Sequence, residues 1–113
     1  MAGASGQEQE SEAAETLARI IYSARALDHL ERAFDHIAEH DLEAGLAAAS
    51  AIRSAIESLR AHPFIGRRVE GETRELVISF GKTGYVALYR FVPAKDEIRI
   101  LAIRHQRELD YPY

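Results

Sequence analysis

The spacing of apolar residues divides the chain into a half with the period of a helix and a half with the period of a strand. From residue 24 to residue 40, apolar side chains recur every three or four positions, which is one face of a helix. The same spacing runs from residue 42 to residue 59, in a stretch rich in alanine, a strong helix former. Ser23 and Asp41 precede these stretches as typical N-caps. The pattern predicts two amphipathic helices that pack as an antiparallel hairpin.

Beyond Pro63, the apolar period changes to two. Segments 74–80, 84–92 and 97–105 are rich in valine, isoleucine and aromatic residues and predict three strands. Short turns separate them, so consecutive strands pair antiparallel as a meander. A further short strand is expected over residues 17–23. The sequence therefore predicts an α+β fold of order β-α-α-β-β-β, in which the hairpin covers one face of an antiparallel meander sheet and the N-terminal strand completes the sheet at one edge.

Composition indicates a single small domain with a tail. The chain has 113 residues, of which 47% are hydrophobic, and this suits one domain with a small core. Residues 1–16 are mostly small, carry four glutamates and lack lysine and arginine. We expect them to form a flexible acidic tail and residues 17–113 to form the folded domain. No signal peptide and no apolar run of about 20 residues is evident. A soluble cytoplasmic protein without membrane contact is expected.

Charge is unevenly distributed. The net charge is −4, yet residues 60–107 hold ten basic residues against five acidic ones. A local positive field of this kind steers a protein toward an anionic partner. An ordinary solvated sheet face would give the same pattern, so charge alone does not distinguish it from a surface that binds an anionic partner.

Several classes of chemistry are excluded or disfavoured by the motifs. The chain has no cysteine, which excludes disulfides, thiolate metal sites and a cysteine nucleophile. No nucleophile-elbow, P-loop or Rossmann pattern is present. His36 and His40 share a helix face, but without an HExxH pattern they fit a solvated polar face better than a metal site. We expect no metal, no cofactor and no small-molecule ligand.

Arginines, tyrosines and a histidine in the second half of the chain are the remaining candidates. Such a mixture binds phosphates, stacks on bases and moves protons in RNA cleavage, and it equally suits an acidic protein partner. Strict strand alternation predicts that Arg90, Arg99 and Arg104 lie on different faces of the sheet. The partner-binding candidates are Arg67, Arg68, Arg74, Arg90 and Arg104.

The segment HPFIGRRVEG, residues 62–71, joins the helical half to the strand half. Pro63 ends the second helix, because the residue before a proline is pushed out of helical geometry, and Gly66 turns the chain toward the sheet. A structural role is the main alternative for Arg67, whose guanidinium would bind helix-end carbonyls or a nearby carboxylate. Arg68 is expected to face solvent.

Several motifs follow one another along the second half of the chain. They are HP-x-x-GR from His62, TREL from Thr73, GYVALYRF from Gly84, EIRILAIRHQRE from Glu97, and Tyr111. This ordered set resembles the RelE/ParE superfamily of toxins from bacterial type II toxin–antitoxin modules, and the resemblance covers about residues 17–111. It implies the fold predicted above and a cognate antitoxin whose C-terminal segment wraps and neutralises the toxin.

The superfamily divides by target, and this sequence departs from the nuclease pattern. RelE-like members cleave messenger RNA in the ribosomal decoding site and typically carry lysines on the first meander strand, where this chain has Glu75 and Val77. RelE has an arginine after the Gly-Tyr of the next strand, where this chain has Val86. Losing cations that stabilise a scissile phosphate costs several kcal/mol of barrier. The departures favour a ParE-like toxin that inhibits DNA gyrase by protein–protein contact through its helical hairpin and C-terminal residues.

The alternative is a RelE-like, ribosome-dependent endoribonuclease. The resemblance then implies His105, Arg107 and Tyr111 as the acid, base and phosphate-binding candidates. A third interpretation is a degenerate toxin that is kept only for complex assembly.

Overall fold

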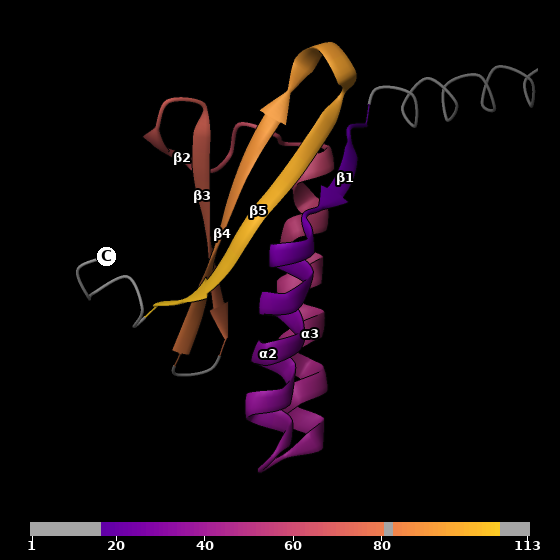
Figure 1. Ribbon diagram of the computed structural model, residues 1–113, viewed down its shortest axis with the longest axis vertical. Coiled ribbons are helices and arrows are strands. Elements are labelled where there is room, and N and C mark those ends of the chain that lie inside the picture. The colour runs from indigo at the N-terminus through magenta and orange to yellow at the C-terminus, as the bar shows by residue number, and fades with distance from the viewer. Residues whose placement is uncertain (1–16, 81–82, 107–113) are drawn as a thin grey trace, which may run out of the picture.

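The protein is a helical hairpin packed on one face of a five-stranded sheet (Figure 1). This computed structural model describes residues 17–80 and 83–106. The predicted α+β fold and its order of a strand, two helices and a meander are confirmed. The elements are β1 (Arg19–Tyr22), α2 (Ala24–Ala38), α3 (Leu42–Glu57), a 3₁₀ turn (Ser58–Arg60), β2 (Arg67–Glu70), β3 (Thr73–Phe80), β4 (Thr83–Val92), a second 3₁₀ turn (Pro93–Lys95) and β5 (Glu97–His105).

The strands follow the order β1-β5-β4-β3-β2. The pairs from β2 to β5 are antiparallel, as the meander requires. β1 completes the sheet at one edge, as predicted, and it runs parallel to β5, so the sheet is mixed. None of the helices in the described part of the chain is long and apolar enough to cross a bilayer.

Sequence periodicity missed one strand and misplaced some ends. β2 lies within the segment interpreted as a junction, and all four of its side chains are exposed, so it has no apolar alternation to detect. It pairs with β3 through its backbone and closes the second edge of the sheet. β1 is shorter than the predicted 17–23. The two helices end at Ala38 and Glu57, each two residues before the predicted end, and a 3₁₀ turn follows α3.

The two predicted N-caps are confirmed. The Ser23 side chain accepts a hydrogen bond from the Ala26 amide at 3.0 Å, and the Asp41 carboxylate accepts one from the Ala44 amide at 3.1 Å. Both bonds satisfy amides that have no partner inside the helix. The core lies between the hairpin and the sheet, and its buried members are Ala18, Ala26, Ile52, Ile56, Leu59, Ile78, Tyr85, Ala87, Tyr89, Ile98, Ile100 and Ile103.

Tyr89 clamps the 62–66 segment to the sheet. Its side chain is fully buried, and its hydroxyl donates to the Pro63 carbonyl at 2.9 Å and accepts from the Gly66 amide at 2.8 Å. A Cβ on Gly66 would lie 2.5 Å from Tyr89 Cε1, which explains why this position takes glycine. Arg74 adds hydrogen bonds to the carbonyls of Phe64 (3.2 Å) and Gly66 (2.8 Å), and its guanidinium lies over the Phe64 ring. The HP-x-x-G motif therefore encodes a fixed connection between helix and sheet.

Removal of the Tyr89 hydroxyl should lower the stability of the protein. Tyr89→Phe leaves the Pro63 carbonyl and the Gly66 amide without this partner, so the free energy of unfolding should fall by about 1–3 kcal/mol. Urea denaturation measures this loss. Tyr22→Phe is the matched control, since the half-buried Tyr22 has no such clamp, and its loss should be smaller. Equal losses in the two variants would contradict the clamp.

The burial of Tyr89 and the partial burial of Tyr22 should make the protein less stable at high pH. Burial raises the pKa of Tyr89 and of Tyr22 above the ordinary value of 10.0. The folded protein keeps these protons at a pH where the unfolded chain releases them, so the free energy of unfolding falls as the pH rises above about 10. Melting temperatures measured from pH 8 to pH 11 should show this decline, with a shallower slope in Tyr89→Phe. An unchanged slope in that variant would show that Tyr89 does not contribute.

Candidate functional site: the open face of the sheet

The sheet face opposite the hairpin, called here the open face, gathers arginines from several strands. Directly opposed residues of antiparallel strands share a face. Arg90 pairs with Arg99 across β4 and β5, and Arg104 pairs with Val86. Since Val86 and Arg90 are four residues apart on regular β4, all these side chains share the open face. The core residues of the same strands occupy the other face.

A β-bulge in β5 produces this arrangement. Leu88 is opposite Ala102, whereas the next residue, Tyr89, is opposite Ile100, so Leu101 is an extra residue. The extra residue reverses the alternation, and Arg99 and Arg104, five apart, reach the same face. The prediction that Arg90, Arg99 and Arg104 lie on different faces was therefore wrong, because it assumed an unbroken period of two.

Carboxylates occupy part of the open face. Glu97, only 8% exposed, forms ion pairs with Arg19 (3.0 Å) and Arg99 (3.2 Å). Glu75 binds Arg67, whose side chain is 78% exposed. Pairs with one exposed member contribute only about 0–1 kcal/mol, so a partner can displace Arg67 at little cost.

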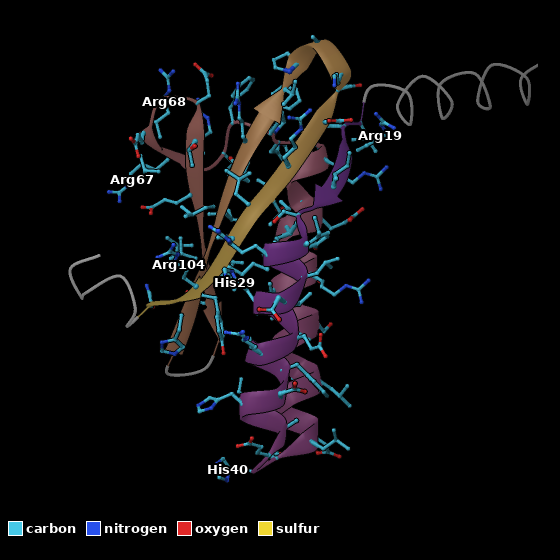
Figure 2. The ribbon with its side chains drawn as sticks, in the orientation of Figure 1. Arg19, His29, His40, Arg67, Arg68 and Arg104 are labelled. Carbon is cyan, nitrogen blue, oxygen red and sulfur yellow. The ribbon has the colours of Figure 1, made fainter. Side chains whose placement is uncertain are left out.

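Two further arginines complete the face. Arg90 is exposed and has no ion pair with the residues that the structure describes. Arg104 is half-buried, and Figure 2 shows it projecting from β5 on the side away from the hairpin. Val77 and Leu88 lie beside them as apolar floor, and Val77 is 55% exposed. An apolar floor with guanidinium groups suits a phosphate backbone or an acidic segment with apolar side chains.

The other two predicted partner-binding arginines lie elsewhere. Arg68 is opposite Arg74 in the β2–β3 register, away from the open face, and forms a loose pair with Glu72 at 3.3 Å. Arg74 binds the carbonyls of the clamp segment, the kind of structural role that the sequence suggested for Arg67. Arg67 instead takes the carboxylate alternative, through Glu75. Arg19 and Arg99 were not among the predicted partner-binding residues, and strand pairing places both on the open face.

Of the three nuclease candidates, the structure describes only His105. His105 lies on the hairpin side of β5 and packs edge-on against Tyr85, with ring centroids 5.3 Å apart. It therefore does not join the open-face arginines. Arg107 and Tyr111 lie outside the described residues. Within residues 17–80 and 83–106, no group of three or more histidines and carboxylates could hold a metal.

The positions that depart from the nuclease pattern do share the open face. Val77 is opposite Val86, and Glu75 is opposite Leu88. Arg104 stands directly across from Val86 on the neighbouring strand. A guanidinium from the next strand therefore shares this face with Val86.

Comparison with known proteins identifies the family. The family described as "ParE toxin of type II toxin-antitoxin system, parDE" matches residues 20–110. Toxin RelE3 of Caulobacter vibrioides is 46% identical over 57 residues, which span 50% of this chain and 60% of RelE3. Toxin RelE1 of the same species is 33% identical over 73 residues, 65% of this chain and 78% of RelE1.

A solved structure agrees with this assignment. The chromosomal ParDE TA system from P. aeruginosa contains a chain with a TM-score of 0.66 and 26% identity, and the match covers 80% of this chain and 97% of that one. The chain therefore belongs to the ParE toxin family of type II toxin–antitoxin systems, within the RelE/ParE superfamily.

Proposed function

We propose that this toxin binds RNA on the open face and acts as a ribosome-dependent endoribonuclease of the RelE type. The observation that carries the proposal is the bulge at Leu101, which brings Arg99 and Arg104 onto the face of Arg90. The sequence argued against a nuclease because cations are missing at three positions. Arg104 beside Val86 supplies positive charge at one of them. The names of the relatives RelE3 and RelE1 agree with this proposal.

In this proposal the arginines bind phosphates and stabilise the charge that develops during cleavage. A guanidinium binds a phosphate through two parallel hydrogen bonds, and its charge does not vary with pH. Arg90 and Arg104 are placed to do this on one face. His105 is not, because it packs on the hairpin side against Tyr85. Tyr111 is therefore the predicted candidate left for proton transfer, while Arg107, which keeps its proton, suits phosphate binding.

The same face is proposed to bind the cognate antitoxin. Exposed Val77 with Arg67 and Arg90 at its margin would accept an acidic segment with apolar side chains. Such a segment would cover the arginines that bind RNA, so neutralisation would follow from simple competition. The antitoxin encoded beside the toxin is the expected partner.

Inhibition of DNA gyrase is the second candidate function. It is favoured by the family match and by the similarity to the P. aeruginosa ParDE structure. The hairpin also offers an apolar contact surface, since Leu42 and Leu46 at the start of α3 are 60% and 55% exposed. A toxin of this kind would act by contact and without chemistry of its own.

Messenger RNA cleavage distinguishes the two proposed targets, the ribosome and DNA gyrase. Antitoxin-free toxin added to a reconstituted translation reaction should cut a defined messenger RNA in phase with its codons, as read by primer extension. Arg104→Gln should slow cleavage about 100-fold, the order found for loss of one group that stabilises the transition state. Arg53→Gln, an exposed arginine of α3, is the control and should cleave normally.

Intact messenger RNA would contradict the nuclease. If the same preparation also abolished plasmid supercoiling by gyrase and left cleaved DNA, the second candidate would replace it. Leu46→Glu should then restore supercoiling, whereas Arg104→Gln should not. Codon-phased cuts that Arg104→Gln leaves unchanged would remove the open face from the mechanism.

A separate prediction concerns the antitoxin. Arg90→Glu places a negative charge on the open face, so affinity for the antitoxin should fall about tenfold, roughly 1.4 kcal/mol. The association rate should fall as well and depend less on salt, because the lost charge no longer steers the partner. Surface plasmon resonance with the product of the adjacent gene measures both. Arg53→Glu is the matched control, and equal losses in the two variants would place the antitoxin elsewhere.

A further inference from the structure

Ser23, the N-cap of α2, and His29 of α2 supply hydrogen-bond partners where β1 stops pairing with β5. β1 pairs only with residues 97–100. Beyond them, the Ser23 amide donates to the Ile100 carbonyl at 3.0 Å, and the Ser23 hydroxyl donates to the Leu101 carbonyl at 3.1 Å. The amide of Ile103 then donates to Nδ1 of His29 at 3.1 Å. Figure 2 shows His29 between α2 and β5. The outer edge of β5 is therefore held by a helix in place of a strand.

The Ile103 amide needs this acceptor. Ile103 is 4% exposed and its side chain belongs to the core, so an amide without a partner here costs free energy. The residue follows the bulge, where the pairing with β4 is already interrupted. His29 can accept only while Nδ1 carries no proton, which places the ring proton on Nε2.

The hydrogen bond between Ile103 and His29 lies where it can fix the register of β5. A slip of β5 by one residue would exchange its faces beyond the bulge. Ile103 would leave the core, and Arg104 would turn from the open face to the hairpin side. The hydrogen bond between the Ile103 amide and His29 lies on the outer edge of β5, at the residue next to Arg104.

We propose that His29 is a positioning residue of the open face. By accepting the Ile103 amide, it fixes the register of β5 beyond Leu101 and holds Arg104 on the same face as Arg90 and Arg99. The effect of His29 on toxin activity rests on the function proposed above. Its effect on the register of β5 does not.

Three variants test this role. His29→Leu removes the acceptor, whereas His29→Asn restores an oxygen close to the place of Nδ1. His36→Leu is the control, because it lies on the same helix and is exposed. Amide hydrogen exchange by NMR should show faster exchange at Ile103 in His29→Leu alone. The cross-strand contact between Arg104 and Val86 side chains, seen as a nuclear Overhauser effect, should weaken in the same variant.

The functional probe is a fluorescent single-stranded RNA oligonucleotide, whose binding is followed by anisotropy at several salt concentrations. Loss of one phosphate contact lowers the slope of log affinity against log salt by about 0.7. His29→Leu and Arg104→Gln should each show this loss, and the double variant should show no more, since both remove the same contact. His29→Asn should keep the wild-type slope.

Three results would overturn the inference. One is unchanged exchange at Ile103 in His29→Leu together with an intact contact between Arg104 and Val86. The second is an additive loss of RNA binding in the double variant, and the third is an equal effect of His36→Leu. If the wild-type protein binds no RNA, the proposed function fails, and the exchange and contact measurements still decide the role of His29. Circular dichroism verifies that each variant is folded.

Discussion

The alternation of side chains along β5, interrupted by one extra residue at Leu101, determines what the sheet presents on each of its faces. Before the bulge, Ile98 and Ile100 point to the hairpin and Arg99 points away; after it, Ile103 points to the hairpin and Arg104 points away. Without the extra residue, a strand with this sequence could not keep its three isoleucines in the core and also hold its two arginines on the open face. A single insertion thus reconciles the demands of the core with those of the open face.

The hairpin does more than cover the core. A bulge leaves backbone groups without strand partners, and buried groups of this kind are costly. The partners come from Ser23, the N-cap of α2, which bonds to the helix and to the strand, and from His29, six residues further along. On β4, Tyr89 also faces the hairpin, and its hydroxyl holds the 62–66 segment by donating one hydrogen bond and accepting another. Polar side chains therefore hold in place both β5 and the connection from α3 to β2.

Periodicity predicted the elements that are half-buried and failed where burial gives no pattern. The helices, the meander and the edge position of β1 follow from apolar spacing, and both caps follow from residue type. β2 was not predicted, because its side chains are all exposed and only its backbone pairs with β3. The open face could be predicted only in part. Arg67, Arg90 and Arg104 were selected as cations, but Arg104 shares the face of Arg90 and Arg99 only through a bulge that no glycine or proline marks. Arg74 holds the clamp segment instead.

The open face keeps more charge than folding needs, and this separates it from a merely solvated sheet face. Arg19 and Arg99 share one nearly buried carboxylate, Glu97, so a positive charge remains after the pair is counted. Arg67 is balanced by Glu75, while Arg90 has no ion pair with the described residues. Clustered guanidinium groups repel one another, and the repulsion is relieved when an anion binds. A surface arranged in this way is more stable when occupied. An RNA backbone and an acidic antitoxin segment would both relieve the repulsion, and because they would occupy the same place, each would exclude the other.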